Sequence, residues 1–116
     1  MKIQDFLNKL KSDTANLVFK DTMAVVETNY SFFPTAFRNG EEMNGVGQNS
    51  GSCKVFAFAK INGFSKQQTL DCFGEYYVND VLKNPKGIDH QNIRNFIIHG
   101  WEGILFEGNA LVPNTQ

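Results

Sequence analysis

The chain has 116 residues, 41% of them hydrophobic and 20% charged, with a formal net charge of −1. A chain of this length buries roughly 60–70% of its unfolded surface, and its 11 phenylalanines can form a core without a metal or disulfide. The near-neutral charge argues against a nucleic-acid partner, because nucleic-acid binders normally carry a basic face. We expect one globular domain over residues 1–112 and a C-terminal tail over 113–116.

The cysteines and the first residues indicate the compartment. Cys53 and Cys72 are the only cysteines, and we expect both to be reduced, as in a cytoplasmic protein. The opening segment MKIQDFLNKL mixes charged and apolar positions, so no signal peptide is expected. No run approaches ~18 apolar residues, so no membrane partner is expected either.

Two helices are predicted in the first third of the chain. Residues 3–10 place apolar side chains at i, i+3, i+4 and i+7, which is typical of an amphipathic helix. Residues 15–19 have no clear pattern and are expected to be irregular. Asp21 suits the N-cap of a second helix, and Pro34 disfavours helix at the residue before it. This helix should therefore end near Tyr30.

The middle of the chain predicts a small β element and a long loop. Residues 35–38 form a strand closed by Asn39-Gly40, and we expect it to pair with a second strand at residues 104–107. The segment 40–51, GEEMNGVGQNSG, contains four glycines and two asparagines and is predicted to be a loop. Long loops in compact domains are commonly functional or mobile.

A central helix is predicted from Ser52, its expected N-cap, through CKVFAFAKI. Alternation fits this run as well as helical spacing does, but Asn62-Gly63 at its end favours a helix. Because the run is apolar on nearly all sides, the helix should be buried.

Two more helices complete the predicted fold. Ser65 and Gln68 have the spacing of a capping box and start a helix that runs through Val81. Within it, Gly74 indicates that another element approaches closely. Asp89 is the expected cap of the last helix, which ends near Gly100. Together the elements predict an α+β, mainly α fold, with about five helices around one core and a minor two-stranded β element.

The loop that runs into Ser52-Cys53-Lys54 is the strongest candidate site. A helix start presents unpaired N–H groups and a partial positive charge, and Lys54 adds a full one, which suits a phosphate or carboxylate. Gly47 and Gly51 have three residues between them, not the four of a phosphate-binding P-loop, so nucleotide hydrolysis by that route is excluded. An ordinary capped helix after a flexible loop is the alternative.

Cys53 is the candidate nucleophile of an enzymatic interpretation. A helix start and a neighbouring lysine both lower a thiol pKa. His90 or His99 could act as base, with Asp89 or Asn92 orienting it. Spacing cannot establish such a triad and cysteines are often buried, so binding is favoured over catalysis.

The sequence offers little support for a metal site and one aromatic residue that could stack on a ligand. No CxxC or HExxH spacing occurs, so neither a metal nor another cofactor is predicted. Trp101 is expected to pack a helix end onto the core, with stacking on a ligand as the alternative. The predicted ligand-binding residues are Asn39, Asn44, Asn49, Ser52, Lys54, Asn92, Arg94 and Trp101.

Four segments together resemble the HopJ type III effector family: TMAVVETNYSFFPTAFRNG, GQNSGSCKVFAFA, QQTLDCFGEYYVNDVL and DHQNIRNFIIHGWEGI. The resemblance runs from about Asp21 to Leu111. It implies a bacterial protein, in the cytoplasm or secreted through a type III system, and brings no catalytic residue, substrate or cofactor with it.

These observations predict that a HopJ-like domain over residues 1–112 acts as a binding module through the segment 40–54. The expected partner is a host or bacterial protein, or a small anionic ligand at the helix start near Ser52. The alternative is a small Cys-His hydrolase or transferase that uses Cys53 with His90.

Overall fold

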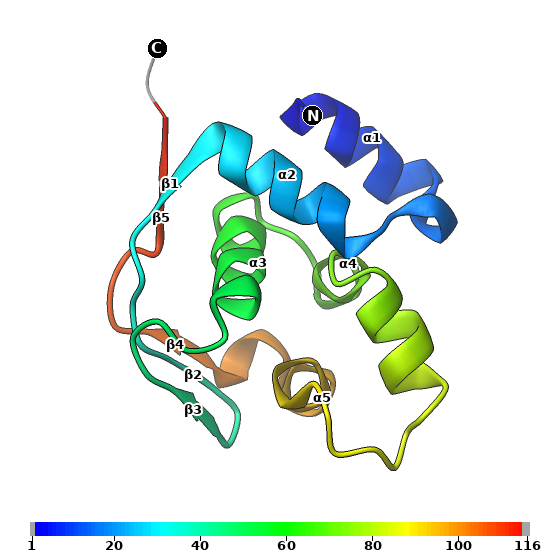
Figure 1. The fold of residues 1–116 in the computed structure, drawn as a ribbon, viewed down its shortest axis with the longest axis vertical. Helices are drawn as coiled ribbons and strands as arrows, with labels where there is room; N and C mark the ends of the chain where they lie inside the picture. The colour runs from blue at the N-terminus through cyan, green and yellow to red at the C-terminus, as the bar shows by residue number, and fades with distance from the viewer. Residues whose placement is uncertain (1, 115–116) are drawn as a thin grey trace.

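The computed structural model describes residues 2–114 and is mostly α-helical. Helix α3 lies in the middle of the molecule, with α1 and α2 on one side, α5 on the other and the short strands along one flank (Figure 1). The predicted α+β, mainly α class is confirmed. The α-helices of the described part are α1 (Ile3–Ser12), α2 (Phe19–Asn29), α3 (Ser50–Ile61), α4 (Lys66–Asp71) and α5 (Gln91–His99).

The core forms around α3, whose apolar residues point in every direction. The ring of Phe56 packs against aromatic rings on α5 and in the strands, at 5.0 Å from Phe96 and 6.1 Å from Phe37. The ring of Phe58 faces the other way, 5.5 Å from Phe6 of α1. A helix that is apolar on all sides is stable only when it is buried, and residues 55–59 are buried. The predicted central helix is confirmed.

The strands form two small antiparallel sheets, where a single pair was predicted. In the first sheet, of order β3-β2-β4, β2 (Phe37–Asn39) pairs with β4 (Ile104–Phe106), which confirms the expected pairing of 35–38 with 104–107. The other edge strand, β3 (Glu42–Asn44), lies inside the segment predicted to be a loop. The second sheet pairs β1 (Tyr30–Phe32) with β5 (Leu111–Pro113), and neither of these strands was predicted. Three-residue strands carry too little alternation to be detected in a sequence unless turn residues mark their ends, as they do for β2 and β4.

Helix α2 begins three residues earlier than predicted, and Asp21 is not its N-cap. The N-cap is Val18, whose backbone N–H donates to the Asp21 carboxylate at 3.3 Å. The N–H of Phe19 donates to Oε1 of Glu75 at 2.7 Å. A carboxylate 56 residues further along the chain thus satisfies a donor at this helix start, which local sequence cannot reveal.

The helix predicted from Ser65 through Val81 is two helices. Its start is confirmed, because the N–H of Gln68 donates to Ser65 Oγ at 3.1 Å and the N–H of Ser65 to Gln68 Oε1 at 3.0 Å. At Gly74 the backbone turns left-handed, with φ +57°, and the chain continues as a π-helix, η2 (Tyr76–Leu82). A Cβ on Gly74 would lie 2.5 Å from the backbone nitrogen of Phe19, so the expected close approach is confirmed.

Two short 3₁₀ helices complete the chain: η1 (Thr14–Asn16), which overlaps the segment 15–19 that was predicted to be irregular, and η3 (Gly100–Gly103) after α5. At the C-terminus, the first two residues of segment 113–116 contact the end of α2 and β1. Pro113 pairs with Tyr30, and the N–H of Asn114 donates to the carbonyl of Asn29 at 3.0 Å. Residues 115 and 116 lie outside the described residues. Among residues 2–114, no helix has the length and apolar character needed to cross a membrane.

Candidate functional site

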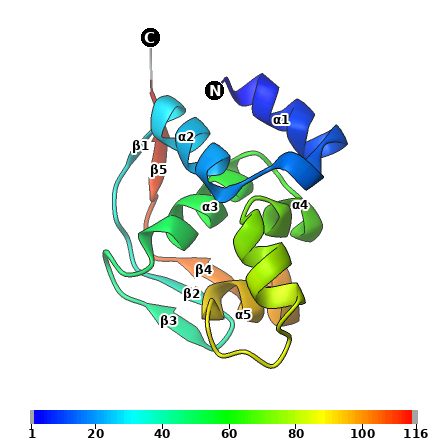
Figure 2. The same cartoon turned by 45° about the vertical axis from the view of Figure 1, so that its right-hand side comes forward.

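A cleft of about 340 Å³ opens between the starts of α3 and α5. Helices α2, α4 and α5 and the π-helix surround α3 at this end of the molecule (Figure 2). One wall is polar and comes from β3 and the two helix starts, and the other is aromatic and comes from α2 and η2. The lining residues are Phe19, Glu42, Asn49, Gly51, Ser52, Phe73, Tyr76, His90, Gln91, Asn92 and Ile93.

Two backbone outliers meet at this cleft. Asn49, with φ 51°, and His90, with φ 49°, are the non-glycine residues of segment 2–114 that have a positive φ. Each is the N-cap of the helix that follows it, and both line the cleft. Left-handed backbone is uncommon outside glycine, although asparagine and histidine adopt it more readily than most residues, and such positions tend to occur at functional sites.

The N-caps predicted from sequence are therefore wrong for both helices. Ser52 is the third residue of α3 and Asp89 precedes the true cap of α5. Among residues 2–114, no side chain caps either helix start. The first N–H groups of a helix have no partner within it, and here Gly51, Ser52, Gln91 and Asn92 bring them to the cleft wall.

A buried network of asparagine amides fixes the start of α5 to the sheet. The Asn92 Oδ1 accepts from Asn39 Nδ2 at 3.0 Å and from Asn44 Nδ2 at 3.1 Å. In return, Asn92 Nδ2 donates to Asn44 Oδ1 at 3.0 Å, an oxygen that also accepts from Asn49 Nδ2 at 2.7 Å. The predicted ligand-binding residues Asn39 and Asn44 are thus buried beneath the cleft, whereas Asn49 and Asn92 line it.

One atom of this network lacks a partner within the described residues. The Asn39 side chain is fully buried, and its Oδ1 accepts no hydrogen bond there. Its Nδ2 donates to the carbonyl of Asn92 at 2.7 Å, which holds the amide in place. The network is therefore chiefly structural, and it positions the cleft wall.

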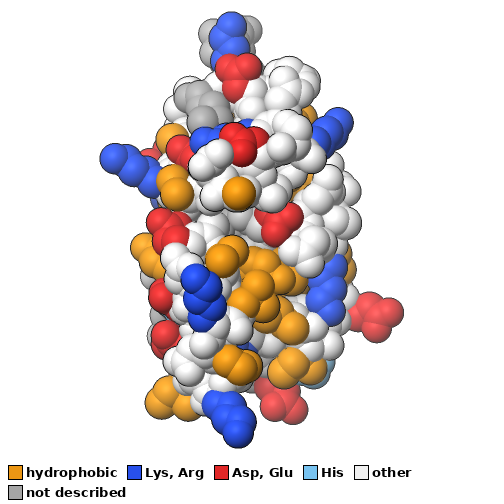
Figure 3. All heavy atoms as spheres, turned by 90° about the vertical axis from the view of Figure 1, so that its right-hand side faces the viewer, with side chains coloured by type: hydrophobic (Ala, Val, Ile, Leu, Met, Phe, Trp, Pro, Cys, Tyr) orange, Lys and Arg blue, Asp and Glu red, His pale blue; other side chains and the backbone are white. Residues whose placement is uncertain are grey.

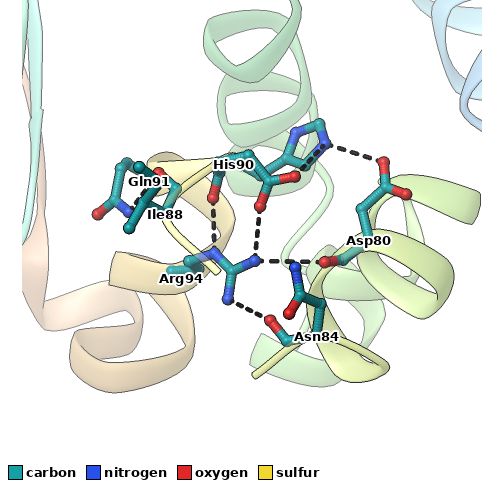
Figure 4. A network of polar contacts seen from close by, with 7 residues as sticks. Asp80, Asn84, Ile88, His90, Gln91 and Arg94 are labelled. Atoms are coloured by element: carbon teal, nitrogen blue, oxygen red, sulfur yellow. Dashed lines mark hydrogen bonds and ion pairs between the residues drawn. The ribbon is translucent and has the colours of Figure 1, made fainter. Parts of the chain in front are cut away.

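The ring of His90 is held by two residues of the π-helix. Its Nε2 lies 3.0 Å from Asp80 Oδ2 (Figure 4), and its ring stacks on that of Tyr76, with centroids 5.2 Å apart. Tyr76 and Asp80 are four residues apart in η2, so one face of that helix supplies both contacts. Asp80, which the sequence interpretation missed, replaces Asp89 as the carboxylate nearest to the imidazole, since Asp89 Oδ2 is 3.9 Å away.

Arg94 stabilises the segment between η2 and α5 by hydrogen bonds, and its side chain does not face the cleft. Its guanidinium donates to Asp89 Oδ1 at 2.6 Å and to the carbonyls of Asn84 and Asp80 at 3.0 and 3.2 Å (Figure 4). The hydrogen bond from Arg94 holds the pKa of Asp89 below its ordinary value. Arg94 therefore stabilises the segment that carries His90, a role different from the predicted ligand contact.

Cys53 and Lys54 point away from the cleft. Cys53 is 2% exposed, and burial raises the pKa of its thiol, outweighing the lowering effects of the Thr35 backbone and of Lys54. Lys54 Nζ pairs with Glu27 Oε2 at 3.1 Å and lies over the ring of Phe32. The environment predicted to favour the Cys53 thiolate is wrong, because the side of α3 that carries Cys53 faces the core. The cationic role predicted for Lys54 at the helix start is not supported by this geometry.

Trp101 packs as expected on the core. Its Nε1 donates to the carbonyl of Phe64 at 3.0 Å, and its ring meets that of Phe96 edge to face at 5.2 Å. It is absent from the cleft lining.

The cleft itself contains few charges. Its lining has no lysine or arginine, and Glu42 is its carboxylate. Within residues 2–114, the side chains of Glu42, Ser52 and Tyr76 make no hydrogen bond or ion pair, so these groups remain available to a ligand. The described residues include no group of three or more His, Cys, Asp or Glu placed to hold a metal ion.

Phe19 forms the apolar wall, and it was not predicted because it lies in a segment without a clear hydrophobic pattern. Its ring lies 5.0 Å from Tyr76 and 6.3 Å from Phe73. A Cβ on Gly51 would lie 3.0 Å from Phe19 Cζ, so the glycine lets the ring reach the first turn of α3. The same contact places the ring beside the free N–H groups.

A second hollow, of about 410 Å³, lies between η2 and α5 and differs in character. Figure 3 shows apolar side chains gathered on the face toward η2, with lysine or arginine side chains on either side. Leu82 and Ile98, which line this hollow, are exposed. Its polar members, Gln91 and Arg94, already bond to backbone carbonyls of the chain. The cleft between α3 and α5 is therefore the better candidate site.

Fold and cleft together define a small, mainly α-helical domain with one polar, aromatic-walled site. The model of the family described as HopJ type III effector protein matches residues 3–111. The chain belongs to this family, as the four quoted segments indicated. Among curated proteins, none matches the sequence.

The chain is also similar to a solved structure, the crystal structure of the unknown-function protein VPA0580. The two sequences are 51% identical over 98% of this chain and 95% of that one, with a TM-score of 0.96. The likeness shows a shared fold over nearly the whole of both chains.

Proposed function

We propose that this protein is a binding protein that holds a small molecule in the cleft between α3 and α5, with a carboxylate or phosphate of the ligand at the two helix starts. The observation that carries the proposal is the coincidence of Asn49 and His90. Both are left-handed, both start a helix and both line the same cleft. Strain of this kind persists only where the surrounding structure enforces it, as at binding sites.

The helix starts supply the donors for such a group. The N–H groups of Gly51 and Ser52 on α3, and of Gln91 and Asn92 on α5, meet at one cleft and are capped by no side chain. Helix N-termini favour anions through these N–H groups and the helix dipole. The free hydroxyl of Ser52 adds a further donor.

Binding is favoured over catalysis because Cys53, the candidate nucleophile, is buried. A buried thiol with a raised pKa is present almost entirely as the unreactive neutral form. Because no lysine or arginine lines the cleft, the affinity should come from short-range hydrogen bonds and change little with salt.

The test is a titration of the ¹⁵N-labelled full chain with 3-phenylpropionate and with inorganic phosphate, followed by NMR. We expect saturable shifts at the amides of Gly51, Ser52, Gln91 and Asn92. Ser52→Ala should weaken binding several-fold, because a ligand loses one hydrogen bond. Lys86→Ala, a change at an exposed residue outside the cleft, is the control. Shifts that saturate elsewhere, with those four amides unmoved, would contradict the proposal.

A further inference from the structure

We infer that the ligand of this cleft is an α-amino acid with a flat aromatic side chain, bound as a zwitterion. The inference rests on the proposed function and adds two groups to the ligand: an ammonium next to Glu42 and a ring against Phe19 and Tyr76. Each of these two groups would contact a feature of the cleft wall that a simple anion would not contact.

The first feature is the unpaired carboxylate of Glu42. It is half-buried on β3, where backbone pairing with Asn39 fixes its position, and it lines the cleft. The two basic groups predicted to bind a ligand here pair elsewhere, Lys54 with Glu27 and Arg94 with Asp89. A ligand that carried only negative charge would be repelled by Glu42. An ammonium supplies three donors and the opposite charge, and it forms a charge-assisted hydrogen bond with the carboxylate.

The second feature is a row of rings along the opposite wall. Phe73, Phe19, Tyr76 and His90 follow one another, with successive centroids 6.3, 5.0 and 5.2 Å apart. Tyr76 is 38% exposed, although it starts a helix that packs on α5. Aromatic rings favour stacked or edge-to-face contacts at these separations, so the row can accept one more ring from a ligand.

The two features and the helix starts fit one molecule. An α-amino acid carries its carboxylate and ammonium on one carbon and its ring one carbon further on. The carboxylate lies at the N–H groups of Gly51 and Ser52, the ammonium at Glu42 and the ring at Phe19 and Tyr76. A volume of about 340 Å³ is at the small end of ligand sites, as suits a molecule of this size.

The inference is tested by calorimetric and NMR titrations with four compounds. L-phenylalanine carries all three groups, 3-phenylpropionate lacks the ammonium, phenethylamine lacks the carboxylate and L-leucine lacks the ring. We expect L-phenylalanine to bind about tenfold or more tightly than each of the others, since each lacks one contact.

Variants assign each contact to its residue. Glu42→Gln keeps the shape of the side chain and should weaken L-phenylalanine about tenfold while leaving 3-phenylpropionate unchanged or tighter. Glu41→Gln, at the exposed neighbouring glutamate, is the matched control and should change neither. Tyr76→Phe should keep the preference for L-phenylalanine over L-leucine, and Tyr76→Leu should reduce it.

Two results overturn the inference while leaving the proposed function standing. One is equal affinity for L-phenylalanine and 3-phenylpropionate, insensitive to Glu42→Gln, with shifts still centred on the helix starts. The other is equal affinity for L-leucine and L-phenylalanine. If none of the four compounds, nor phosphate, moves the amides of Gly51 and Ser52, the proposed function fails as well.

Discussion

The first backbone N–H groups of a helix have no partner within the helix. Helix α4 differs from α3 and α5 in how these groups are treated. At α4, Ser65 and Gln68 satisfy each other's backbone donors, and the helix start is closed by residues three apart in sequence. At α3 and α5, left-handed Asn49 and His90 begin the helices, and no side chain caps them. The difference is that the closed start needs only local sequence, whereas the open ones depend on contacts from distant parts of the chain.

Those distant contacts are specific. Asn92, in the first turn of α5, binds Asn39 and Asn44 of the sheet, and His90 binds Asp80 of η2. Asn49 donates to Asn44 across the same network. A helix start that is held in this way can leave its N–H groups without partners. The buried hydrogen bonds of the network offset the free energy that those unpaired groups cost. We expect this to be why the cleft lies here and not beside α4.

The substitution with the largest expected effect is at Gly74, where the backbone of Phe19 approaches too closely for a side chain. Gly74→Ala should lower the free energy of unfolding by about 3 kcal/mol, from left-handed strain and overlap with the backbone of Phe19. Gly63→Ala is the matched control, since Gly63 also has a positive φ, +67°, but has no atom within 4 Å of the new Cβ. It should cost about 1 kcal/mol, and equal losses in urea denaturation would show that the approach of Phe19 is unimportant.

The next test breaks the network that fixes the start of α5. Asn92→Ala leaves the buried amide donors of Asn39 and Asn44 short of an acceptor and should cost about 2–3 kcal/mol. Asn109→Ala, at an exposed asparagine, should change stability by less than about 0.5 kcal/mol. Thermal unfolding of both variants measures the difference, and a neutral Asn92→Ala would mean that the network does not hold the helix.

A pair of serines compares the two kinds of helix start directly. Ser65→Ala removes a cap and should cost about 1 kcal/mol. Ser52→Ala removes a hydroxyl that caps nothing, so its effect should stay within about 0.5 kcal/mol. Chemical denaturation separates the two, and a similar loss in both variants would place Ser52 in a structural role instead of at an open site.

The smallest expected effect concerns the thiols at neutral pH. Burial raises the pKa of both Cys53 and Cys72 above the ordinary value of 9.0. In the native protein, alkylation by iodoacetamide should therefore be much slower than for a free thiol. Fast modification of Cys53 near pH 7 would show that the start of α3 activates it after all.

The same pKa shifts predict a dependence of stability on pH. Above about pH 9 the unfolded chain loses thiol protons that the folded chain keeps, so it binds fewer protons and the free energy of unfolding falls. Below that pH the contribution is constant. Unfolding curves at pH 7, 8 and 10 in the presence of a reductant measure this, and Cys53→Ala should reduce the slope at high pH.

Local signals in the sequence were reliable where a few neighbouring residues decide the outcome. The capping box at Ser65, the amphipathic spacing of residues 3–10 and the apolar run of α3 each gave a helix that the structure confirms. The strand pair 35–38 and 104–107 was also found, because turn residues bound both segments. The N-caps predicted at Ser52, Asp89 and Asp21 were wrong. The preference of a residue type for the N-cap position does not by itself determine where the helix backbone begins.

The sequence by itself determined the class of fold and the central position of α3, and the segment 40–54 that it indicated supplies part of the cleft lining. It could do so because hydrophobic spacing and capping chemistry act over a few residues and need no partner. Only the tertiary structure decided which side chains share the cleft: Phe19, Glu42, Tyr76 and His90 come from four separate segments. It also turned Cys53 and Lys54 away, because the orientation of a helix about its axis follows from what packs around it.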